Sequence, residues 1–192
     1  VGCITGLVDR DRLITGEQIQ AGHVVIGLAA NGLHTNGYSL ARKVLFDDAG
    51  YSVDMIPEGW DESVGDALLR PHVCYWPAIK RALMHKVRIH GMAHITGGGW
   101  FDNIKRILPE GTAVVCDVDK LPVPPVMELI GAEGQVDRRE MYRVFNMGMG
   151  MAWIVPVSEM EGALEACREE DIGAAVVGEV IAGDKDVSLR GS

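Results

Sequence analysis

Three short loops of the sequence combine glycine with polar side chains: residues 31–37 (NGLHTNG), residues 96–99 (TGGG) and residues 146–150 (NMGMG). The first two lie between a strand pattern and a helix pattern, where unpaired N–H groups and the positive end of the helix dipole suit phosphate. We therefore predict substrate or phosphate contacts, with ordinary turns as the alternative. The residues concerned are Asn31, Gly32, His34, Thr35, Asn36, Gly37, Thr96, Gly97, Gly98, Gly99, Asn146 and Gly148.

The glycine triplet, Gly97 to Gly99, carries the stronger signal of the first two loops. Three glycines directly before a helix let backbone N–H groups converge on an anion with no side chain in the way. We expect that no structural requirement explains three consecutive glycines. A flexible turn is the alternative, and it has about equal weight.

The third loop leads into a glycine-rich strand pattern, residues 145–155. With a period of two, Gly148 and Gly150 would share one face and leave a flat strip for a ligand or another backbone. Met147, Met149 and Met151 would then point into the core, as packing residues. Asn146 heads the strip, where it could contact a ligand or cap a neighbouring turn.

His34 is the candidate catalytic side chain, because an imidazole can donate and accept a proton near neutral pH. A histidine bonded inside its own turn is the alternative. The other histidines show no metal-ligand spacing, and His90 with His94 would share a strand face without a third ligand, so we predict no metal site. Arg42 could reach a phosphate, although an exposed helical arginine is the simpler explanation.

Strand and helix patterns alternate along the chain, and we expect a single domain over residues 1–192. Strands are predicted at 2–8, 24–28, 87–95, 112–118, 145–155, 174–181 and 186–189, with the last two paired as a hairpin. Helices are predicted from 38, 63, 77, 100, 126, 137 and 158, with capping boxes at Ser63 and Ser158. Crossovers of unequal length favour a mixed α/β fold, a mixed sheet covered by helices.

Composition narrows the class of protein. The net charge is −9 without a basic stripe, which argues against nucleic acid as a partner. No apolar stretch is long enough to span a membrane. Four cysteines without a C-x-x-C spacing indicate reduced thiols in a cytoplasmic protein. Because Val1 falls inside an apparent strand, we expect a piece of a longer chain.

Taken in order, GLAANGLHTNGYSLAR, GMAHITGGGWFDNIKRILP and PVPPVMELIGAEGQVDRREMYRVFNMGMGM resemble the C-terminal half of the phosphoribosylformylglycinamidine cyclo-ligase (aminoimidazole ribonucleotide synthetase) family. The resemblance runs from about Val1 to Val187. Ala30 and Asn31 stand where the family usually has a serine pair. The resemblance implies a three-layer α/β/α domain with a mixed sheet.

The function that this resemblance implies is ATP-dependent closure of an imidazole ring on formylglycinamidine ribonucleotide in purine biosynthesis, a ligase reaction that releases ADP and phosphate. It also implies a homodimer, and ATP and Mg²⁺ bound mostly by an N-terminal half that this chain lacks, so we expect the chain alone to be inactive. The alternatives are a related ATP-dependent enzyme, such as selenophosphate synthetase, thiamine-monophosphate kinase or formylglycinamidine ribonucleotide synthetase, and a non-catalytic ligand-binding module.

Overall fold

The central strand, β1 (Val24–Ala29), is buried on both faces. The computed structural model describes residues 3–191. Val25 belongs to one hydrophobic cluster, whereas Ile26 and Leu28 belong to a second cluster. Because successive side chains of a strand point to opposite faces, these clusters lie on the two sides of the sheet. Such a strand must run through the interior, between layers of helices.

Six strands within residues 3–191 form one sheet in the order β2-β4-β1-β5-β3-β6. The other strands are β2 (Gly91–His94), β3 (Thr112–Asp117), β4 (Met149–Val155), β5 (Ala174–Ala182) and β6 (Val187–Arg190). All neighbours run antiparallel except β3 and β6, which are parallel. The predicted mixed sheet is therefore confirmed.

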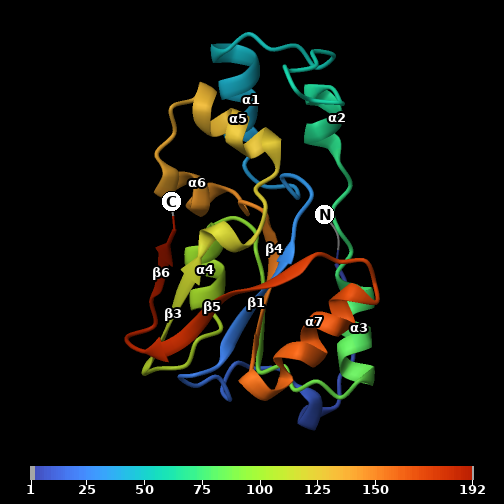
Figure 1. Ribbon diagram of the computed structural model, residues 1–192, viewed down its shortest axis with the longest axis vertical. Coiled ribbons are helices and arrows are strands. Elements are labelled where there is room, and N and C mark those ends of the chain that lie inside the picture. The colour runs from blue at the N-terminus through green and yellow to red at the C-terminus, as the bar shows by residue number, and fades with distance from the viewer. Residues whose placement is uncertain (1–2, 192) are drawn as a thin grey trace.

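Helices cover both faces of this sheet (Figure 1). Helices α3 (Trp76–Met84) and α7 (Met160–Arg168) pack on each other over the face of Ile26. The opposite face carries α4 (Gly99–Lys105) and α6 (Arg138–Val144). Three more helices belong to the same hydrophobic cluster and lie together beyond one end of the sheet: α1 (Tyr38–Arg42), α2 (Val64–Leu69) and α5 (Pro125–Glu133). The remaining turns are a π-helical segment (Lys43–Asp48) and 3-10 turns at Arg10–Arg12, Val118–Lys120 and Val157–Glu159. The arrangement is the mixed α/β fold that the sequence predicted.

Local start signals account for several helices. The Ser63 hydroxyl accepts a hydrogen bond from the Asp66 N–H at 3.1 Å, which confirms the predicted cap of α2. Pro77 lies in the first turn of α3, where its missing N–H costs nothing. Asp137 caps α6 through the N–H groups of Arg139 and Glu140. At Ser158 the predicted capping box is wrong, because Ser158 lies in a 3-10 turn and the N-cap of α7 is Glu159, without a side-chain bond.

Three predicted strand features are wrong. Residues 3–8 form no strand and are exposed, while Val1 and Gly2 of that prediction lie outside the described residues. The strand predicted at 87–95 is shorter, because β2 begins at Gly91. Strands β5 and β6 do not form a hairpin, since β3 lies between them and pairs with both. Among residues 3–191 no helix is long and apolar enough to cross a membrane.

Candidate active site

The three predicted loops meet at one end of the sheet, and Asn146 joins them. Its side-chain amide donates to the Gly32 carbonyl at 2.9 Å, and its Oδ1 accepts from the Gly148 N–H at 2.9 Å. The indole N–H of Trp100, at the start of α4, donates to the Asn146 carbonyl at 2.6 Å. Asn146 is only 2% exposed, so its amide holds the loops together and is not turned toward a ligand.

The glycine triplet is required by packing at two of its three positions. Gly98 and Gly99 have φ of 96° and 58°, in the left-handed region that disfavours other residues. A Cβ on Gly99 would stand 1.9 Å from the Tyr142 carbonyl oxygen. The expectation that nothing structural requires these glycines is therefore wrong for Gly98 and Gly99. Gly97 differs, since it is exposed and the nearest atom to its Cβ position is Asn36 Oδ1 at 3.6 Å.

A buried amide that sequence reasoning missed shapes this loop. Asn103, 5% exposed, donates to the carbonyls of Thr96, Gly97 and Gly99 at 3.2, 3.3 and 2.8 Å. Its spacing of four residues after Gly99, on the helix that the loop precedes, was the available signal. Within residues 3–191 the N–H groups of Gly97 and Gly98 donate to no acceptor, so they are available to an anion.

The flat glycine strip predicted on the third loop does not exist. Gly148 precedes β4, with φ of 90°, and its Cβ position lies 2.3 Å from the Pro122 carbonyl oxygen. Gly150 lies within β4, where its Cβ position is 2.0 Å from the Tyr75 hydroxyl and 3.0 Å from His34 Nδ1. Both glycines are therefore explained by close approaches inside the protein, and both are buried. Met149 is in the core as predicted, with no exposed surface.

His34 is 2% exposed and neutral. Its Nε2 lies 2.7 Å from Asn31 Oδ1 and 3.4 Å from the backbone nitrogens of Asn31 and Val73. The side-chain nitrogen of Asn31 donates to the Pro71 carbonyl at 3.0 Å. The Nδ1 atom is buried and has no hydrogen-bond partner among residues 3–191. Burial, followed by the nearby His72 and His94, lowers the pKa of His34 from 6.5 to about 4.

Two further histidines, which sequence reasoning dismissed, complete a cluster. The ring of His72 stacks on His34 with centroids 4.0 Å apart, and its Nε2 lies 3.1 Å from His94 Nε2. Because His72 Nδ1 faces the Val73 carbonyl at 2.7 Å, Nδ1 carries the hydrogen and Nε2 accepts from His94. Burial is the main cause that lowers the pKa of His94, and the nearby His72 lowers this pKa further. His90 instead contacts His23, with ring centroids 4.9 Å apart.

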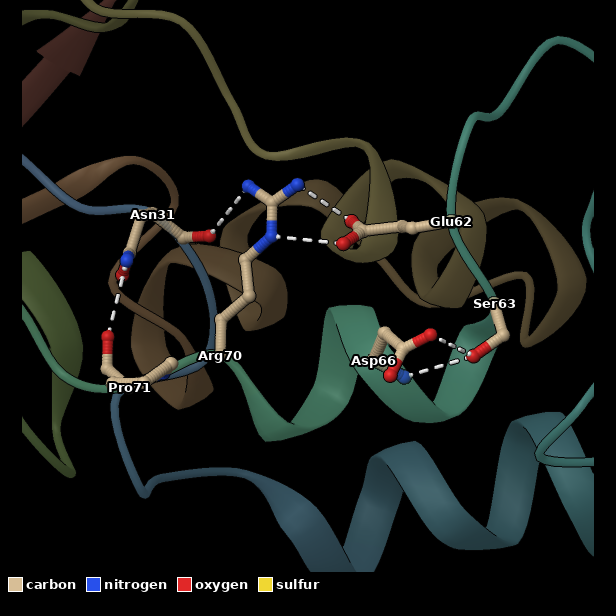
Figure 2. A network of polar contacts seen from close by, with 6 residues as sticks. All are labelled: Asn31, Glu62, Ser63, Asp66, Arg70 and Pro71. Carbon is tan, nitrogen blue, oxygen red and sulfur yellow. Dashed lines mark hydrogen bonds and ion pairs between the residues drawn. The ribbon is translucent and has the colours of Figure 1, made fainter.

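The first loop is fixed from outside by a polar network (Figure 2). The guanidinium of Arg70 contacts Glu62 through two nitrogens, at 2.6 and 3.2 Å, and reaches the Asn31 carbonyl at 3.4 Å. Within the loop, His34 and Thr35 have φ of 52° and 71°. A β-branched residue such as Thr35 rarely adopts that conformation, and such strain concentrates at binding sites. Thr35 is exposed.

The part of the chain that the structure describes offers no group of three or more His, Cys, Asp or Glu residues suited to a metal ion. What the loops offer is the N–H groups of Gly97 and Gly98, with the half-buried Asn36 next to Gly97, an arrangement that can bind an anion. Arg42 is exposed on α1.

Solved structures of ATP-using enzymes share this fold. Thiamine-monophosphate kinase from Stenotrophomonas maltophilia is 14% identical, with a TM-score of 0.59 over 96% of this chain and 55% of that one. Hydrogenase maturation protein HypE, in complex with ATP, is 18% identical with a TM-score of 0.60 over 95% of this chain and 51% of that one. At these identities the likeness defines the class of domain alone.

The sequence model of the family described as "AIR synthase related protein, C-terminal domain" matches residues 20–190, and the chain belongs to this family. Relatives named phosphoribosylformylglycinamidine cyclo-ligase occur in Alkaliphilus metalliredigens, 42% identical over 98% of this chain and 54% of the relative, and in Bacillus mycoides, 39% identical over 100% and 55%. The recognised family is thus confirmed. The chain spans about half the length of these curated relatives.

Proposed function

We propose that this chain is the C-terminal half of a two-domain phosphoribosylformylglycinamidine cyclo-ligase and carries loops that bind its substrate. The observation that carries the proposal is that three segments far apart in sequence meet at Asn146: residues 31–37, residues 146–150, and Trp100, which directly follows the loop 96–99. Relatives named for this reaction are 42% and 39% identical over nearly the whole chain, which supports the same assignment.

The reaction is the ATP-dependent cyclisation of formylglycinamidine ribonucleotide. The formyl oxygen of the substrate takes the γ-phosphoryl group of ATP, an amine nitrogen attacks the activated carbon, and the C–O bond breaks to release phosphate. The products are aminoimidazole ribonucleotide, ADP and phosphate. Such chemistry relies mainly on positioning and on stabilising negative charge. We assign that task in this chain to the N–H groups of Gly97 and Gly98, with Asn36 beside Gly97.

We assign His34 a positioning role in place of the proton transfer near neutral pH that its residue type predicted. Because its pKa is lowered to about 4, it would act as a neutral imidazole that holds the first loop and orients substrate. Following the family resemblance, we place the Mg²⁺ ligands and most ATP contacts in the other half of the enzyme. We also propose that the complete enzyme is a cytoplasmic homodimer, in keeping with four free cysteines.

The test is a fusion of the N-terminal half of the Alkaliphilus relative to this chain. Formylglycinamidine ribonucleotide should trigger ADP release by the fusion, whereas thiamine monophosphate should not, and the chain alone should be silent. A folded fusion that releases no ADP with the first substrate would contradict the proposal. Release with thiamine monophosphate instead would assign the chain to a sister enzyme.

A loop variant sharpens this test. Gly97→Val should leave the protein folded, because the Cβ position of Gly97 meets nothing closer than 3.6 Å, yet it should raise the substrate KM at least tenfold by covering the N–H groups. The matched control is Gly131→Ala in α5, which has the same 3.6 Å of free space, to Met141 Cε, but lies in a helix away from the loops. Equal KM values for the two variants would show that the glycine triplet does not contact the substrate.

A further inference from the structure

The segment 3–14 contributes almost nothing to the hydrophobic core of this domain. Its apolar side chains are exposed to unusual degrees: Ile4 99%, Leu7 104%, Val8 59%, Leu13 52% and Ile14 39%. Single exposed apolar residues are ordinary on a protein surface, but five within eleven consecutive positions are not. Water contact with so much apolar surface is unfavourable, so the segment has the character of a surface that is normally covered.

The segment also stands apart from the body of the domain. Between it and the end of α3 lies an open groove of about 1010 Å³, lined by Leu7 and Leu13 on one side and by Leu83 and Met84 on the other. Figure 1 shows this part of the chain running outside α3 and reaching its 3-10 turn at the end of the molecule opposite α1. A segment that belonged to this core would have closed such a gap, because protein interiors are close-packed.

The sequence of the segment is nevertheless that of a strand. Cys3, Thr5 and Leu7 alternate with Ile4 and Val8, and β-branched residues fit a pleated, half-buried surface. Both faces of such a strand carry apolar groups. In this domain, however, residues 3–8 form no strand and pair with neither edge of the sheet, β2 or β6.

Residues 3–14 lie outside the match to the family's C-terminal domain but inside the match to the full-length relatives. The sequence model of the C-terminal domain begins at residue 20, whereas the Bacillus mycoides relative matches 191 residues, 100% of the chain, and is almost twice as long. Residues 3–14 therefore belong to the whole protein of this family and lie outside the domain that the rest of the chain forms.

We propose that residues 3–8 form a β-strand of the other half of the protein. This strand pairs with the edge of a sheet in that half, and apolar side chains of that half cover it. The inference rests on the two-domain organisation proposed above. Ile4 and Val8 lie on one face of this strand and pack into the hydrophobic core of the other half of the protein. The 3-10 turn, Arg10–Arg12, then begins the connection that returns the chain to β1.

Hydrogen exchange tests this pairing without reference to activity. In the isolated chain the N–H groups of residues 3–8 should exchange at the rate of an unstructured peptide. In the fusion with the N-terminal half of the Alkaliphilus relative they should be protected at least 100-fold. Protection that stays the same in both proteins would overturn the inference, even if the fusion were active. An inactive fusion with protected residues would contradict the proposed function only.

Two variants of the fusion show which half of the protein residues 3–8 pack against. Ile4→Ser combined with Val8→Ser should lower the protection of residues 3–8 at least tenfold. The control, Leu83→Ser combined with Met84→Ser, changes the opposite wall of the groove and should leave that protection unchanged. If the control variant lowers it equally, the segment docks on its own domain and the inference is wrong.

Discussion

Acid should destabilise this domain through His34, and His34→Gln should remove that part of the effect. The histidine is 2% exposed, its Nδ1 has no partner within residues 3–191, and its folded-state pKa is about 4 against an ordinary value of 6.5. Between these two values the unfolded chain binds a proton that the folded chain rejects. The stability that this group contributes is therefore complete above about pH 6.5 and is lost as the pH falls toward 4.

The size of the loss follows from the two pKa values. At about pH 4.5 the unfolded imidazole is almost fully protonated, while about three quarters of the folded imidazole is still neutral. The linkage relation then gives a loss of roughly 2 kcal/mol between about pH 7 and about pH 4.5 from this one group. Carboxylates, and His94 with its lowered pKa, add losses that wild type and variant share.

The assay is urea unfolding of the wild type, His34→Gln and Asn36→Ala at about pH 7 and about pH 4.5. Glutamine keeps an N–H that can donate to Asn31 but has no group that titrates in this range. The pH-dependent loss should be smaller by roughly 2 kcal/mol in His34→Gln. Asn36→Ala removes the 3.2 Å bond to the His34 carbonyl and should lower stability equally at both pH values. An equal pH-dependent loss in wild type and His34→Gln would refute the argument.

Two further predictions concern the loops. Asn146→Ala should lower the free energy of unfolding by about 3 kcal/mol, because it leaves the buried Gly32 carbonyl and Gly148 N–H without partners, and thermal unfolding will measure this. A loss below about 1 kcal/mol would contradict the role of Asn146. Gly99→Ala should cost more than 2 kcal/mol or prevent folding, since its Cβ would stand 1.9 Å from the Tyr142 carbonyl, whereas Gly97→Ala should cost less than about 1 kcal/mol. Equal costs in the two glycine variants would contradict the packing argument.

Local patterns in the sequence were enough to predict most of the elements. The apolar run around Val25 and Ile26 predicts a strand buried on both faces, and the structure confirms it. Ser63 and Asp137 predict helix starts because each caps N–H groups within three residues of itself. These signals depend on interactions between close neighbours, which a sequence displays directly.

The pairing of strands could not be predicted in the same way. Strand β3 pairs with β5 through Val114 and Val180, and with β6 through Val114 and Val187. Nothing in the short turn between β5 and β6 shows that a strand formed about 60 residues earlier takes the place between them. The glycine triplet was misinterpreted for the same reason, because the carbonyl that forbids a side chain on Gly99 belongs to Tyr142 in another helix.

The histidine cluster shows how the same limit affects the candidate site. His34, His72 and His94 are widely separated in sequence and carry no recognisable spacing, yet β2 and β1 flank β4 and so bring the loops around them together. Once together, they bury His34 and lower its pKa, so that at neutral pH it is a hydrogen-bonding group and not a charged one. The charge stabilisation proposed for the loops would then rest on the backbone N–H groups of Gly97 and Gly98, which no substitution at His34 can remove. Loss of turnover in a His34 variant with normal stability would therefore indicate a direct contact with substrate.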